Sequence, residues 1–102
     1  MADRTWTRQH DAVLAERCEG RKVKLKVGVP VIPLYSTNLL DTIRAADALK
    51  EKKGLSIWGF ISTQGGYFNG WAIASNGVIF DAFHRDPALA LAWALYDAVG
   101  GV

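Results

Sequence analysis

Three apolar, aromatic-rich runs within residues 55–83 constrain the fold of this chain more than any other feature. Residues 63–66 separate the first run from the second, and residues 75–77 separate the second from the third. The second separator contains Asn76 and Gly77, which tolerate the positive φ angles of a tight hairpin. Helical patterns precede and follow the stretch. The sequence therefore predicts a three-stranded antiparallel meander between helices.

Both faces of the predicted sheet are apolar. In the first strand Leu55, Ile57 and Ile61 share one face, whereas Trp58 and Phe60 share the other. An antiparallel sheet with one face in water alternates apolar and polar residues instead. Either helices cover both faces, or one face meets a partner or a ligand. We expect an α+β fold, with three to four antiparallel strands and helices packed on both faces.

Three helices are predicted around the meander. The first covers residues 7–19 and ends at Gly20, a favoured residue for a C-terminal cap. The second follows residues 35–38, whose side chains accept hydrogen bonds from the free amides of a helix start. In the third, Asp86 caps the first turn and Pro87 fits it, because proline lacks the donor that a first turn leaves unpaired.

Residues 21–29 alternate basic and apolar side chains, which is typical of a strand or an extended arm with one wet face. Lys24 and Lys26 lie on the wet face. Most of the lysines and arginines fall in residues 1–28, although the net charge of the whole chain is only +2. This basic segment is either a solvated surface or a face for an anion, such as a phosphate, a nucleic acid or an acidic protein.

A chain of 102 residues, of which 50% are hydrophobic, is expected to form one globular domain. Its parts are an N-terminal helix and basic arm over residues 1–34 and a helix–meander–helix core over residues 35–102. The single cysteine, Cys18, permits no intramolecular disulfide and suits a reducing cytoplasm. Cys18 and His10 cannot form a zinc site by themselves, since zinc needs three or four ligands, and we expect no cofactor. No apolar run is long enough to span a membrane.

Asp81, His84, Arg85 and Asp86 form the only ionisable cluster near the predicted sheet. A histidine beside a carboxylate can perform general acid–base chemistry. The same residues also suit plain structural roles, with Asp86 as a helix cap and the others in a loop or on the surface. No catalytic motif accompanies them, so we do not expect an enzyme.

Aromatic side chains on the predicted sheet are the remaining functional candidates. They can stack on a planar base while basic side chains contact its phosphate. Alternatively, the same rings pack beneath the helices as part of the core. The amount of apolar surface in so small a chain also indicates a homo-oligomer. The residues of the candidate ligand site are Trp58, Tyr67, Trp71, Lys24, Lys26, His84 and Arg85.

The order helix, three antiparallel strands, helix invites comparison with the double-stranded RNA-binding domain. That family contacts RNA through a basic start of its last helix. The corresponding residues here, 85–90, contain one arginine and no lysine. We therefore do not expect double-stranded RNA as a partner.

Four segments resemble the phage ABA sandwich domain, a family of small, mostly uncharacterised phage and prophage proteins. They are HDAVLAER at residues 10–17, PLYSTN at 33–38, GWA at 70–72 and DPALA at 86–90. The resemblance spans most of the chain, but residues 21–29 depart from it, because a tryptophan-containing stretch is expected there. It implies a sheet with helices on both sides and a viral origin, and it transfers no catalytic residue.

These expectations predict a small phage-encoded accessory protein that acts by binding in the cytoplasm of an infected bacterium. In the first hypothesis, a homo-oligomer sequesters a nucleotide-type signalling molecule, a counter-defence role by analogy with other small phage proteins. In the alternative, an apolar patch docks on a host or phage protein, such as a host defence protein, and inhibits or modulates it without a small-molecule ligand. No membrane partner is expected.

Overall fold

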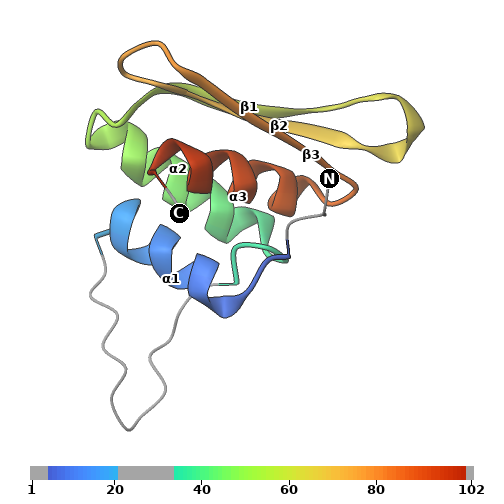
Figure 1. Cartoon of the computed structure of the whole chain (residues 1–102), viewed down its shortest axis with the longest axis horizontal. Helices are drawn as coiled ribbons and strands as arrows, with labels where there is room; N and C mark the ends of the chain where they lie inside the picture. Colours follow the sequence, from blue (N-terminus) through green and yellow to red (C-terminus); the bar gives the residue numbers. More distant parts are fainter. Residues whose placement is uncertain (1–4, 21–33, 101–102) are drawn as a thin grey trace, which may run out of the picture.

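The structure, a computed structural model, describes residues 5–20 and 34–100. Figure 1 shows three layers: a sheet, a pair of helices beneath it, and one further helix on the far side of that pair. In chain order the elements are α1 (Arg8–Arg17), α2 (Leu39–Glu51), β1 (Leu55–Ser62), the short 3-10 turn η1 (Gln64–Gly66), β2 (Phe68–Ala74), β3 (Ile79–His84) and α3 (Pro87–Ala98).

The sheet is the antiparallel meander that the sequence predicts, with strand order β1-β2-β3. Its register aligns Gly59, Trp71 and Asp81 in one row across the three strands. One detail of the predicted faces is wrong. A β-bulge between Leu55 and Ile57 adds one residue to β1, so the two side chains lie on opposite faces rather than on the same one.

The predicted α+β arrangement, with helices packed on an antiparallel sheet, is confirmed. The expectation that helices cover both faces is corrected: all the described helices lie on one side of the sheet (Figure 1). The physical reason lies in α3, which is apolar around its whole circumference and is buried from Ala88 to Tyr96 with the partial exception of Leu89. Such a helix needs cover on two sides. The sheet covers one side, and α1 covers the other instead of reaching the second face of the sheet.

Close approach between α3 and β2 depends on small residues. Gly70 faces Ala90, and a Cβ atom built on Gly70 would stand 2.4 Å from the carbonyl carbon of Ala90. Ala72, on the same face of β2, is completely buried. Because glycine and alanine let the helix backbone come this near, the face of β2 that carries them is the one that receives α3.

A network around a buried carboxylate holds α1 to the second layer. Asp11 accepts hydrogen bonds from the Trp6 indole at 2.9 Å, from the Arg8 guanidinium at 2.7 Å and from the backbone N–H of Tyr35 at 3.0 Å. The Thr42 hydroxyl donates to the Tyr35 carbonyl at 2.6 Å and so links α2 to the same turn. Both carboxylate oxygens of Asp11 therefore accept hydrogen bonds within the fold, as a buried acid requires.

Several local predictions are confirmed. The Asn38 side chain accepts from the backbone N–H of Asp41, and Asp86 accepts from Ala88, so both caps stand at their helix starts. Cys18 is a buried free cysteine, and burial raises the pKa of its thiol to about 12. The basic arm over residues 21–29 lies outside the described residues.

Candidate functional site

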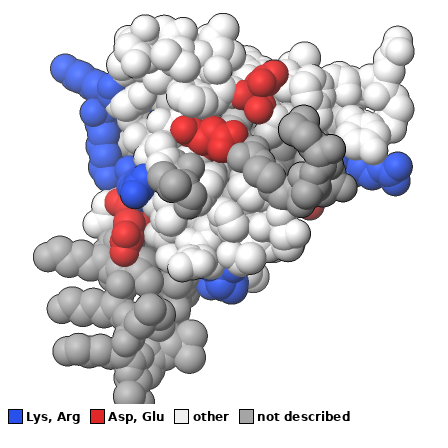
Figure 2. All heavy atoms as spheres, viewed as in Figure 1, with Lys and Arg blue, Asp and Glu red and all other residues white. Residues whose placement is uncertain are grey.

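The face of the sheet opposite the helices carries four of the eight large hydrophobic side chains that are exposed in the described part of the chain. Ile79 is 66% exposed, Phe83 62% and Ile61 55%, values that are unusual for side chains of this size. Figure 2 shows mostly uncharged surface along the sheet at the top, with basic side chains toward its two ends. We call this surface the open face. By register it consists of Ile57, Gly59, Ile61, Asn69, Trp71, Ile73, Ile79, Asp81 and Phe83.

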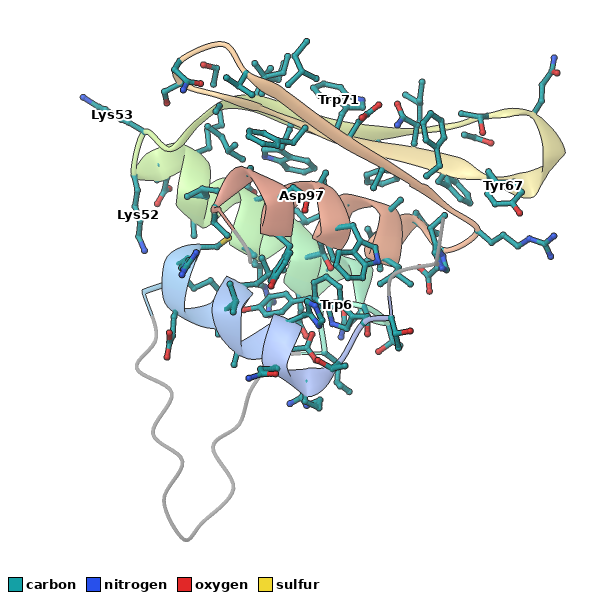
Figure 3. All side chains as sticks on the ribbon, in the orientation of Figure 1. Trp6, Lys52, Lys53, Tyr67, Trp71 and Asp97 are labelled. Carbon is teal, nitrogen blue, oxygen red and sulfur yellow. The ribbon has the colours of Figure 1, made fainter. Side chains whose placement is uncertain are left out.

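Trp71 lies across the middle of the open face. A Cβ atom built on Gly59 would come within 2.6 Å of the six-membered ring of Trp71, so the indole covers this glycine of the neighbouring strand. Figure 3 shows Trp71 on the side of the sheet away from the helices. No described group accepts a hydrogen bond from its indole N–H, unlike those of Trp6 and Trp58, which donate to carboxylates.

Asp81 is the one charged residue on the open face, between Ile79 and Phe83 on β3. It stands directly opposite Trp71 on the adjacent strand. It is exposed, and no described residue forms an ion pair or a hydrogen bond with its carboxylate. The open face thus pairs an unused donor on Trp71 with an unused anionic acceptor on Asp81.

A groove of about 480 Å³ runs along the outer edge of β3, next to the start of α3. The Arg85 guanidinium lies over the Tyr67 ring at 5.3 Å, a cation–π contact that closes the hairpin end of the groove. Tyr67 projects at that end in Figure 3. The residues that line the groove are Tyr67, Asp81, Ala82, Phe83, His84, Arg85 and Trp93. The groove therefore shares Asp81 and Phe83 with the open face.

The candidate acid–base cluster has structural hydrogen bonds. His84 accepts a hydrogen bond through Nδ1 from the backbone N–H of Asp86 at 3.1 Å. The Asp86 carboxylate caps α3 by accepting from Ala88 at 2.9 Å. No described carboxylate hydrogen-bonds to His84. The arrangement contains no histidine–carboxylate pair with which to begin acid–base chemistry, and the expectation of a non-enzyme stays a prediction.

The structure brings together only part of the predicted ligand site. Tyr67, His84 and Arg85 meet in the groove. Trp71 lies on the open face, whereas Trp58 packs on the helix side and donates its indole N–H to Asp47 at 3.1 Å. The three predicted aromatics therefore do not form one wall. The two predicted lysines, Lys24 and Lys26, lie outside the described residues.

The described residues offer no metal centre. Within residues 5–20 and 34–100, no three His, Cys, Asp or Glu side chains gather as a metal ion would require. None of the helices in the described part of the chain is long and apolar enough to cross a membrane.

The residues that the sequence prediction missed are the isoleucines and Phe83 of the open face, which had no place in the candidate ligand site. One signal points to them. In the middle of β2, small residues (Gly70 and Ala72) alternate with large ones (Trp71 and Ile73). Small residues mark the face that a helix approaches closely, so the large residues mark the face left for another occupant.

Comparison with protein-family models, with curated proteins and with solved structures finds no match for this chain. The resemblance to the phage ABA sandwich domain thus depends on the four sequence segments alone.

Proposed function

We propose that this protein acts by binding, and that its open face holds a protein partner. The observation that carries the proposal is the exposure of large apolar side chains on all three strands, including Ile61, Ile79 and Phe83. Exposed apolar patches of this kind mark interaction surfaces in soluble proteins. Covering them removes apolar area from water at about 25 cal/mol per Å², which drives association.

The shape of this surface favours a protein over a small molecule. The open face is a sheet surface, and Trp71 lies over Gly59 on it rather than forming the wall of a pocket. Small ligands bind in concave sites that enclose most of their surface, whereas protein interfaces are broader and flatter. In this proposal the protein inhibits or modulates its partner. The phage origin and the counter-defence role remain predictions from the resemblance.

Photo-crosslinking tests the proposal in cells that naturally contain the protein. Benzoylphenylalanine replaces Ile79 on the open face in one variant and Leu40 on α2 in the control, because Leu40 is 56% exposed but belongs to another layer. We expect a discrete heavier product from position 79 and none from position 40. Equal products from both positions, or none from position 79, would contradict the proposal.

Sequestration of a nucleotide-type molecule is a second candidate, favoured by the contact between Arg85 and Tyr67 in the groove. A base could stack on aromatic groove walls while Arg85 contacts a phosphate. The Asp81 carboxylate in the same lining weighs against it, because it repels an anion. Native mass spectrometry of the purified protein tests this candidate. A retained nucleotide-sized mass that disappears in Arg85→Ala supports it, and a ligand-free protein contradicts it.

A further inference from the structure

We propose that the open face selects a partner segment in which an arginine stands between apolar side chains, and that Asp81 and Trp71 bind this arginine. The inference rests on the proposed function, because it specifies the partner of the same face. On β3, Ile79 and Phe83 flank an acid on a surface that is otherwise apolar or uncharged.

An apolar partner without charge does not fit this face. Covering Asp81 with hydrocarbon would strip water from a carboxylate that no described residue pairs. A buried unpaired charge is among the most unfavourable features that an interface can contain. The partner must therefore bring a cation to the place where Ile79 and Phe83 are covered.

A second copy of the chain does not supply that cation through the same face. The open face has no lysine or arginine among its described residues, and a symmetric contact would bring a second Asp81 toward the first. Two carboxylates in one contact repel each other. The charge on the face thus favours a different protein over self-association.

The position of Trp71 favours arginine over lysine as the cation. The indole lies over Gly59, so one face of the ring is turned to the sheet and the other is available for stacking. Trp71 and Asp81 are direct cross-strand partners, which places their Cβ atoms about 5 Å apart. A planar guanidinium can stack on an indole and donate two parallel N–H groups to a carboxylate, whereas an ammonium group is a point charge.

The donor of Trp71 completes the recognition. No described group accepts from its indole N–H, so this N–H is free for a backbone carbonyl of the partner segment. The site therefore offers one acceptor for a cation, one ring for stacking and one donor for a peptide group. Apolar side chains on either side of the arginine would cover Ile79 and Phe83.

Short synthetic peptides provide the test with the full-length protein. The probe has a central arginine flanked by valines, and its match has citrulline, which keeps the shape but loses the charge. Binding is followed by NMR through the indole N–H signal of Trp71. The protein variants are Asp81→Asn and, as a control of equal charge change, Glu16→Gln on α1, which is exposed and distant from the sheet.

We expect the arginine peptide to shift the Trp71 signal and to bind about tenfold more tightly than the citrulline peptide, a difference of about 1.4 kcal/mol. Asp81→Asn should abolish this difference, and Glu16→Gln should preserve it. Equal affinities of the two peptides for the unmodified protein, or no binding of the arginine peptide, would overturn the inference. The crosslinking experiment tests the proposed function separately. Crosslinks from position 79 together with equal affinities for the two peptides would support binding of a protein partner and contradict the arginine preference.

Sedimentation of the same samples tests the choice of partner. The apolar surface alone indicates a homo-oligomer, but the charge of Asp81 on the open face leads us to expect a monomer without peptide. A dimer that Ile79→Ser dissociates would assign the open face to a second copy and overturn the inference.

Discussion

The two faces of the sheet differ in the size of the side chains on the central strand. On the helix side, Gly70 and Ala72 let α3 approach within contact of the β2 backbone. On the open side, Trp71 and Ile73 stand on the same strand and no described helix covers them. Both faces are apolar, so hydrophobicity alone does not decide which one becomes core. Side-chain size decides it, because a helix packs most closely where the sheet carries no bulk.

The largest loss of stability is expected when a side chain is removed beneath the sheet. Leu91 on α3 is completely buried, so Leu91→Ala should lower the free energy of unfolding by about 3 to 4 kcal/mol through lost burial and a cavity. The control, Ile61→Ala on the open face, should cost less than about 1 kcal/mol, because Ile61 is already in water. Urea denaturation measures both. Similar costs would mean that the open face is covered in the isolated protein.

A second test adds an atom to each face. Gly70→Ala places a methyl group against the Ala90 backbone, which cannot move away, and should destabilise the protein by about 3 kcal/mol. Gly59→Ala meets only the Trp71 ring, which can swing outward, and should cost about 1 kcal/mol. Thermal unfolding separates the two variants. A larger loss for Gly59→Ala would show that the Trp71 ring is fixed.

Two acids, one buried and one exposed, should differ in the same way. Asp11 accepts three hydrogen bonds in the interior, including one from Arg8, so Asp11→Asn should cost about 2 kcal/mol. Asp81→Asn should change the free energy of unfolding by less than about 0.5 kcal/mol, because its carboxylate is exposed and unpaired. Guanidinium denaturation measures the pair, and a large cost for Asp81→Asn would reveal a structural partner.

The smallest effect on stability is expected when apolar residues of the open face are replaced by polar ones. Ile79→Ser and Phe83→Ser should each change the free energy of unfolding by about 0.5 kcal/mol or less, since both side chains are mostly exposed. The same variants should reduce the fluorescence of a dye that binds apolar surface. Leu40→Ser, the control on α2, should leave most of the dye signal intact. An unchanged signal in Ile79→Ser and Phe83→Ser would mean that the dye binds elsewhere.

The features that the sequence predicts well are those decided by neighbouring residues. Asn76 and Gly77 form the turn between β2 and β3. Asn38 and Asp86 cap their helices by accepting hydrogen bonds from backbone N–H groups in the first helical turn. The meander and the start of each capped helix follow from such short-range chemistry. Their prediction needs no knowledge of how elements that are distant in the sequence pack together.

The features that the sequence does not predict depend on competition between distant elements. The helix α1 could have covered the second face of the sheet, but α3 is apolar all round and binds α1 on its far side. The bulge between Leu55 and Ile57 likewise adds one residue to β1 and places these two side chains on opposite faces of the sheet. The groove is also non-local, because Tyr67 directly precedes β2 and Trp93 lies on α3, two elements that β3 separates in the chain.

Because Cys18 is buried, the rate at which its thiol is alkylated reports how often the α1 layer opens. The thiol lies inside the protein and its pKa is about 12, so an alkylating reagent in neutral solution reacts only after the chain opens around it. If α1 separates from α2 and α3 while the sheet stays folded, alkylation will outpace global unfolding; if the three layers open together, the two rates will coincide. The native thiol of Cys18, without any engineered cysteine, thus reports whether α1 separates from the rest of the protein on its own.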